Sequence, residues 1–229
     1  MSLDIIIFAV VAAVLVARLK SILGTKHGDE RKRSNPFAGM DGKVANQASQ
    51  TARLDANVEN IAHTLIIDDK IIKAEDPAAV KQGIKDIDAA DQNFDLNEFM
   101  HGARMAFQMI TEAFAEGDRE TLKSLLSEDL YKSFERVIKT REDQKLTASY
   151  ELHRIKDARI ADARLGGVMA YVTVDFDVEN TATLKDSKGK MVEGDPDKIA
   201  EVHDIWTFAR DVRADDPNWE LVSTRIGDG

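Results

Sequence analysis

The hydrophobic period of this sequence changes once, and that change restricts the fold more than any other feature. Between Phe94 and Asp118, apolar residues recur mostly at steps of three and four, which places them on one face of a helix. From Val168 to Glu179 the period becomes two, the alternation of a β-strand with one buried face. Helices that precede strands in this way predict an α+β fold.

Turn and capping residues divide the two halves into elements. Gly117 ends the first helix, Asp118 caps a second and Ser127 is placed to cap a third, which predicts about three helices between residues 95 and 145. We expect these helices to pack on a curved four-stranded antiparallel sheet, with a hairpin turn at Gly166-Gly167. The predicted strands are Tyr150–Ala163, Val168–Glu179, Ile199–Val212 and Trp219–Ile226.

Charge is unevenly distributed along the 229 residues. The formal net charge is −10, but the first 50 residues hold seven Lys or Arg and only four Asp or Glu, so the remainder carries −13. An acidic body argues against nucleic acid as its partner. The chain has no cysteine, which excludes disulfides, thiol nucleophiles and zinc sites with sulfur ligands.

A membrane anchor is predicted at the start of the chain, over residues 1–23. Thirteen apolar residues run without interruption from Ile5 to Ala17, and the wider window Leu3–Leu23 is long enough as a helix, at about 31 Å, to cross a bilayer. No small-residue cleavage site follows, which disfavours a cleaved leader. A buried helix of a soluble domain is the alternative, disfavoured because the run has no polar face. The anchor residues include Ile5, Phe8, Val11, Val14 and Leu15.

Basic residues follow the apolar run and predict its orientation. Because positive charge stays inside, we expect a single-pass protein with its body in the cytoplasm or an equivalent compartment. The same side chains either contact anionic lipid head groups or merely set the topology. They are Arg18, Lys20, Arg31, Lys32 and Arg33, with Lys26 between them.

A spacer and two short helices are expected between anchor and body. Residues 24–56 are polar and basic and read as a flexible linker. Residues 57–93 contain apolar residues at helical spacing around Val58–Ile66 and Val80–Ile87, and Asp76 and Pro77 suit the start of the second helix. These approach helices pack on the body or lie on the membrane, and the sequence does not choose. The body is then residues 94–229.

One strand has an unusual face, on which Asp204, Trp206, Phe208 and Arg210 alternate with other residues. The aromatics either fill a core or line a pocket. Asp204 either pairs with Arg210 or another cation, or is a carboxylate with a raised pKa that acts as a base. No histidine pair has metal-ligand spacing and no phosphate loop occurs, so we expect no enzyme activity, no cofactor and no metal site.

Three stretches resemble the Tim44-like domain family in this order. They are FDLNEFMHGARMAFQMITEAFAEGDRETLKSLLSEDLYKSFERVI, DIWTFARD and DPNWELVSTR, and together the resemblance covers Phe94 to Ile226. The short N-terminal span and basic neck are similar to bacterial members of that family. Nothing here resembles the long N-terminal region with which the mitochondrial member recruits a chaperone.

The resemblance implies a cone similar to nuclear-transport-factor-two-like domains, with an apolar pocket between helices and sheet. It implies an adaptor on the cytoplasmic face of the bacterial inner membrane that binds polypeptides in translocation, insertion or assembly. The alternatives are a domain that binds a lipid or small apolar ligand, and an enzyme that uses Asp204. The residues that the resemblance places in or beside the pocket are Phe94, Phe99, Phe107, Phe114, Trp206 and Phe208.

Overall fold

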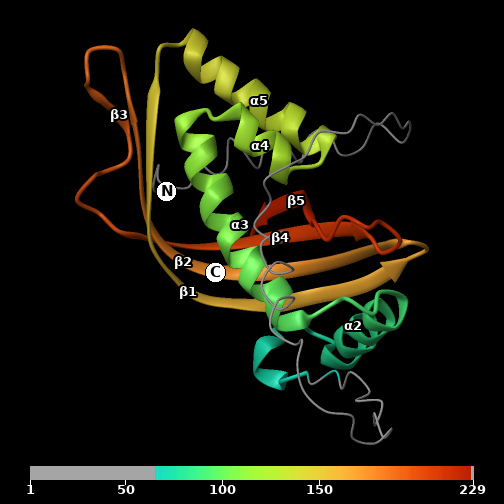
Figure 1. Cartoon of the computed structure of the whole chain (residues 1–229). Helices are drawn as coiled ribbons and strands as arrows, with labels where there is room; N and C mark the ends of the chain where they lie inside the picture. Colours follow the sequence, from blue (N-terminus) through green and yellow to red (C-terminus); the bar gives the residue numbers. More distant parts are fainter. Residues whose placement is uncertain (1–64, 66, 228–229) are drawn as a thin grey trace, which may run out of the picture.

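The computed structural model describes residue 65 and residues 67–227, and within them the fold is α+β, as predicted (Figure 1). A short 3-10 turn and four α-helices come first, and an antiparallel sheet follows. The helical elements are η2 (Asp69–Ile71), α2 (Pro77–Ala90), α3 (Leu96–Glu116), α4 (Arg119–Leu125) and α5 (Glu128–Asp143). The strands are β1 (Thr147–Gly166), β2 (Met169–Lys185), β3 (Met191–Glu193), β4 (Ala200–Asp211) and β5 (Glu220–Ile226).

Aspartates begin three of the helices, because a carboxylate accepts hydrogen bonds from backbone N–H groups that have no partner in the first turn. Asp76, Asp95 and Asp118 each accept two such bonds, at 2.7 to 3.1 Å. Gly117 ends α3 in the left-handed conformation, with φ of 77°. Ser127 occupies the N-cap position of α5 without a side-chain hydrogen bond. The three predicted helices between residues 95 and 145 are confirmed.

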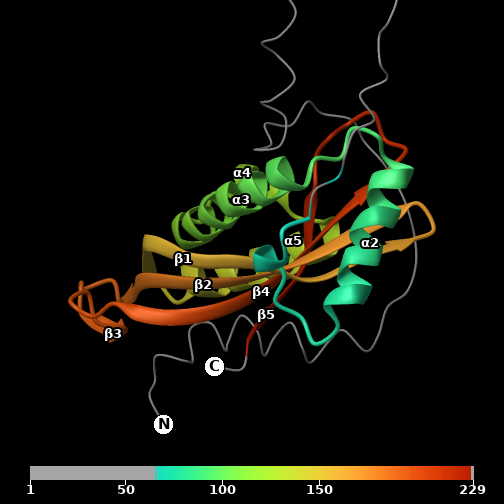
Figure 2. The same ribbon diagram turned by 90° about the horizontal axis from the view of Figure 1, so that it is seen from below.

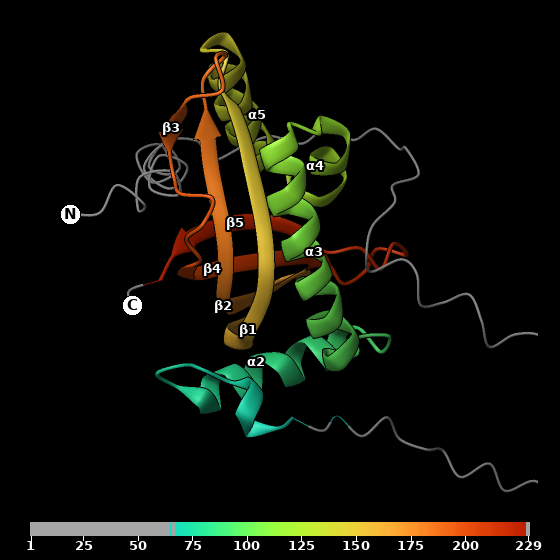
Figure 3. The same cartoon turned by 90° about the vertical axis from the view of Figure 1, so that its left-hand side faces the viewer.

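The sheet has the order β1-β2-β4-β5, and β3 pairs with the far end of β2. Gly166 pairs with Met169, so the hairpin loop is Gly167-Val168, one residue later than predicted. Gly167 adopts a φ of +66°, which favours glycine at that position. Three register shifts interrupt the β1–β2 ladder, and Figure 3 shows this long hairpin curving beside α3. The predicted four strands are confirmed, and β3 was missed.

The core lies between α3 and the inner face of the sheet. Phe107 on α3 packs against Phe176 of β2 and Trp206 of β4, with ring centroids 4.7 and 4.5 Å apart. The alternating apolar residues of β2 are all fully buried, as their period of two predicted. They are Ala170, Val172, Val174, Phe176 and Val178.

The second approach helix, α2, packs on the outer strand β1 (Figure 2). Just before it, Ile72 bridges to Ile160, and the Lys73 N–H donates to the Ile160 carbonyl at 2.9 Å. Of the first approach helix, expected around Val58–Ile66, the structure describes only Leu65, which is not helical, and the rest lies outside the described residues. The predicted anchor and linker also lie outside them. Within residues 65 and 67–227, no helix is long and apolar enough to cross a bilayer.

Gly83 allows α2 to approach β1 closely, and we expect Gly83→Ala to destabilise the fold. A Cβ at this position would lie 1.8 Å from the Ala163 carbonyl oxygen and 2.5 Å from its carbon, so backbone would have to move. We expect the free energy of unfolding to fall by about 3 kcal/mol, at the upper end of overpacking costs. Chemical denaturation measures this change. At a helical glycine without such an obstruction, substitution by alanine raises the stability by about 1 kcal/mol, because alanine has the higher helix propensity. A gain in stability for Gly83→Ala would therefore contradict the prediction.

Candidate functional site

A cavity of about 380 Å³ lies between the helices and the sheet at one end of the domain. Its lining comes from the end of α3, from α5, from the start of β1, from the end of β2, and from β3, β4 and β5. Most of the lining is apolar. Such a volume admits a few side chains or a short apolar chain, which is the size range of ligand pockets.

Aromatic rings form part of the cavity wall. Phe114 of α3 and Phe134 of α5 meet edge to face, with centroids 4.9 Å apart, and both line the cavity with Trp206 of β4. Phe114 lies at the end of the apolar face of α3 and is half-buried, whereas the residues of that face before it are buried. The cavity therefore begins where the packing of α3 on the sheet ends.

The six aromatics expected at a pocket separate into two groups. Phe114 and Trp206 line the cavity. The other four are buried in the core and are not part of its lining: Phe107 and Phe208 pack against Trp206, while Phe94 and Phe99 pack against Trp219. Phe134 and Tyr150, which also line the cavity, were missed. Helical spacing indicates which residues share a face of the helix, but it does not indicate which of them line a cavity and which are packed in the core.

Asp204 places a carboxyl group in the cavity wall, and its side chain is nearly buried. Burial raises the pKa of this carboxyl to about 7, opposed by a hydrogen bond from the Trp206 side chain. The expected ion pair with Arg210 is wrong, because the Arg210 guanidinium binds Asp91 instead, with Nη1 and Oδ2 2.6 Å apart. Within the described residues, Asp204 forms no ion pair.

Tyr150 of β1 lines the cavity near Asp204. Its hydroxyl has a raised pKa, first because it is buried and second because the Asp204 carboxylate disfavours a second negative charge. Thr111 also lines the cavity, and its hydroxyl donates to the Phe107 carbonyl at 2.8 Å. The apolar cavity thus contains a polar region at Asp204, Tyr150 and Thr111, and this region is neutral when Asp204 is protonated.

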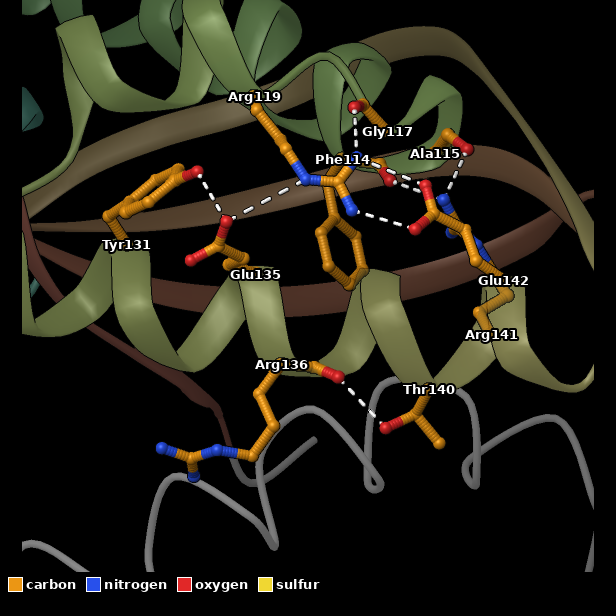
Figure 4. Close-up of polar contacts among 10 residues, drawn as sticks. All are labelled: Phe114, Ala115, Gly117, Arg119, Tyr131, Glu135, Arg136, Thr140, Arg141 and Glu142. Atoms are coloured by element: carbon orange, nitrogen blue, oxygen red, sulfur yellow. Dashed lines mark hydrogen bonds and ion pairs between the residues drawn. The ribbon is translucent and has the colours of Figure 1, made fainter.

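Two arginines fasten α5 beside the cavity (Figure 4): Arg141 of α5 binds the end of α3, and Arg119, the first residue of α4, binds α5. The Arg141 guanidinium donates to the carbonyls of Phe114 and Ala115 at 3.0 and 2.8 Å, so it satisfies carbonyl groups at the C-terminal end of α3. Arg119 donates to both carboxylate oxygens of Glu142, at 3.0 and 2.8 Å. The Arg141 contacts therefore tie together α3 and α5, the two helices that line the cavity.

Two further arginines in the lining have no such partner. Arg136 of α5 and Arg225 of β5 are exposed, and no hydrogen bond or ion pair joins either guanidinium to another described residue. Figure 4 shows the Arg136 side chain extending away from the Arg141 side of α5. The cavity therefore has positive charge available at its margin.

Metal binding has no evident location in the part of the chain that the structure describes. No three His, Asp or Glu side chains there lie close enough together to hold an ion. The expectation of no metal and no cofactor stays a prediction.

A family model described as the Tim44-like domain matches residues 80–226, which include α3, the whole sheet and every residue of the cavity. A probable mitochondrial import inner membrane translocase subunit of Caenorhabditis elegans is 31% identical over 153 residues, 64% of this chain and 36% of that protein. The mouse mitochondrial import inner membrane translocase subunit TIM44 is 28% identical over 139 residues, 58% of this chain and 30% of that protein. The chain thus spans about a third of each of these two relatives.

A bacterial protein matches along nearly its whole length. An uncharacterized protein of Rickettsia prowazekii (strain Madrid E) is 22% identical over 222 residues, 96% of this chain and 95% of that protein. This match extends over the N-terminal region as well as the domain that carries the cavity.

Proposed function

Because the chain belongs to the Tim44-like domain family, we propose that it is a membrane-anchored adaptor that handles polypeptides during translocation, insertion or assembly. The anchor is the apolar segment Leu3–Leu23, the basic residues after it face anionic head groups, and the domain lies on the cytoplasmic side of the bacterial inner membrane. Anchoring raises the effective concentration of the domain near membrane-bound clients.

The observation that carries this proposal is the open apolar cavity beside α5. Apolar side chains of an unfolded or unassembled polypeptide are exposed to water, and transfer into the cavity removes that surface from water. Each fully buried side chain of the size of Leu or Phe contributes about 1.5–3 kcal/mol, so binding through one or two such residues is weak and reversible. Weak binding suits an adaptor that must release its client.

A lipid or other apolar ligand is the second candidate, because the same cavity accepts an acyl chain. No enzymatic activity is part of the proposal. Asp204 has the raised pKa that a general base needs, but no second catalytic group is placed with it among the described residues apart from Tyr150, whose raised pKa keeps it protonated.

Photocrosslinking in living cells tests which ligand enters the cavity. We expect a photoreactive phenylalanine in place of Val137, which lines the cavity, to form adducts with polypeptides. The same group in place of Lys139, exposed on α5 and outside the lining, is the matched control and should form far fewer adducts. Deleting residues 1–23 should remove the adducts with membrane-bound clients.

Three outcomes would reject the polypeptide proposal. They are equal adduct formation at positions 137 and 139, no adduct at either position, and an adduct at position 137 with only the mass of a lipid. The last of these would instead support the second candidate, and lipid that co-purifies in stoichiometric amount would agree with it.

A further inference from the structure

The outer edge of β5 is only partly covered. β5 is the last strand in the sheet order, and Leu126 forms a parallel bridge with Leu221 at its start. The Ser127 N–H donates to the Leu221 carbonyl at 3.0 Å. α5 then begins at Glu128, and its backbone forms no ladder with the strand. Two residues of the chain thus already pair with this edge, and the pairing stops where the helix starts.

The backbone groups beyond that point can be assigned from the register. The Gly227 N–H donates to the His203 carbonyl at 2.9 Å, so Gly227 directs its N–H toward β4. In an antiparallel ladder this direction alternates, so the N–H and C=O groups of Thr224 and Ile226 point away from β4. No backbone hydrogen bond joins these four groups to another described residue.

This uncovered edge borders the cavity. Thr224 and Ile226 belong to its lining, and they pair in register with Trp206 and Asp204, which line it from β4. Val137 and Thr140 of α5 line it as well. A molecule in the cavity therefore lies beside backbone donors and acceptors that pair with no other described residue. An acyl chain has no groups to pair with them, whereas an extended polypeptide offers N–H and C=O groups at the matching spacing.

The positive charge beside this edge favours a ligand that carries an acidic group. Arg136 and Arg225 line the cavity without a carboxylate partner among the described residues. Two acidic residues are also in the lining: Glu193, which already has an interaction partner, and Asp204, which lies farther inside and is nearly buried. These two guanidinium groups are therefore complementary to an acidic side chain of a ligand whose neighbouring apolar side chain enters the cavity.

We propose that the cavity binds a polypeptide in extended form, which adds a strand to the outer edge of β5 at Thr224 and Ile226. One apolar side chain of that segment enters the cavity toward Trp206, and an acidic neighbour lies at Arg136 and Arg225. This inference rests on the proposed function and specifies the conformation and sequence class of the client.

N-methylated peptides test the strand pairing without changing the protein. The probe is a fluorescein-labelled nine-residue peptide with one central Phe, flanking Glu residues, and Ser or Thr elsewhere, titrated against the full chain in detergent by anisotropy. One derivative carries N-methyl groups at two odd positions and the other at two even positions. Because only alternate N–H groups of an added strand face β5, we expect one derivative to bind at least about tenfold more weakly and the other to bind within about threefold of the parent.

Charge variants provide a second measurement. Replacing the Glu residues of the probe by Lys, or changing Arg136→Gln and Arg225→Gln in the chain, should each weaken binding by about two- to fivefold, and the effect should shrink in high salt. Lys139→Gln removes a charge from the same helix outside the lining and is the control.

Equal binding of the two methylated derivatives, or no binding of the parent peptide, would overturn the inference. In either case, polypeptide adducts at position 137 would still support the proposed function. The two experiments therefore test the proposed function and the mode of binding independently. A further outcome is that position 137 gives no polypeptide adduct, but the two methylated peptides bind with different affinities. This would support strand pairing at β5 and contradict the cellular role proposed above.

Discussion

Arg210→Met should lower the free energy of unfolding by about 3–5 kcal/mol, the largest loss that we expect from any single substitution in the domain. The Arg210 and Asp91 side chains are 8% and 6% exposed, and they form a 2.6 Å ion pair. Asp91 follows the end of α2, so the pair joins the α2–α3 connection to β4. Removing the cation leaves a buried carboxylate without a counter-charge, which is costly because the interior solvates charge poorly. Denaturant titration gives the change directly.

Two variants separate this effect from a general loss of charge. Arg213→Met removes an exposed arginine that pairs with Asp211 at the surface, and it should change stability by less than about 1 kcal/mol. In an Arg210→Met and Asp91→Asn double variant, most of the lost stability should return, because no unpaired charge remains buried. Additive losses in the double variant would show that the pair is not coupled.

Asp204→Asn should stabilise the domain at pH 8, by up to about 4 kcal/mol. The carboxyl pKa rises on folding from its ordinary 3.8 to about 7, and 1 pH unit corresponds to about 1.4 kcal/mol. Below pH 4 the group is protonated whether the chain is folded or unfolded. Between about pH 4 and 7 only the folded chain holds the proton, so the free energy of unfolding falls as the pH rises through this range. Above it, the folded chain carries a buried anion, which asparagine avoids.

Denaturation of both proteins at pH 5 and pH 8 tests this dependence. The wild-type chain should lose more stability than Asp204→Asn between the two values. Asp197→Asn, at an exposed turn, should follow the wild-type chain at both. An Asp204→Asn variant that is less stable than the wild type at pH 8 would mean that the carboxylate is stabilised by contacts rather than penalised by burial.

Local signals in the sequence predicted most of the fold. Asp76, Asp95 and Asp118 begin helices because their carboxylates can cap adjacent N–H groups, and this chemistry depends only on neighbouring residues. The period of two over β2 is equally local. The hairpin loop was predicted one residue early because both Gly166 and Gly167 permit a turn, and only the pairing of Gly166 with Met169 decides between them. β3 is three residues long, too short to show a period.

The site was less predictable because it depends on contacts between distant residues. Arg210 pairs with Asp91, 119 positions earlier, and no local pattern distinguishes this partner from Asp204 on the same strand. The resemblance placed six aromatics in or beside a pocket, and of these Phe114 and Trp206 line the cavity. The unpaired edge of β5 had no sequence signal, since it arises from the point at which α5 begins.

The attachment of α2 has a mechanical consequence. The Lys73 backbone, the close approach at Gly83 and the Asp91 ion pair all fasten the start of the domain to the sheet, and none of the described residues before Ile110 lines the cavity. Figures 1 and 3 place α2 and α5 at opposite ends of α3. A pulling force applied at Ile67 would therefore load α2 and β1 first. Tension on the N-terminal side of the domain would therefore reach the cavity last.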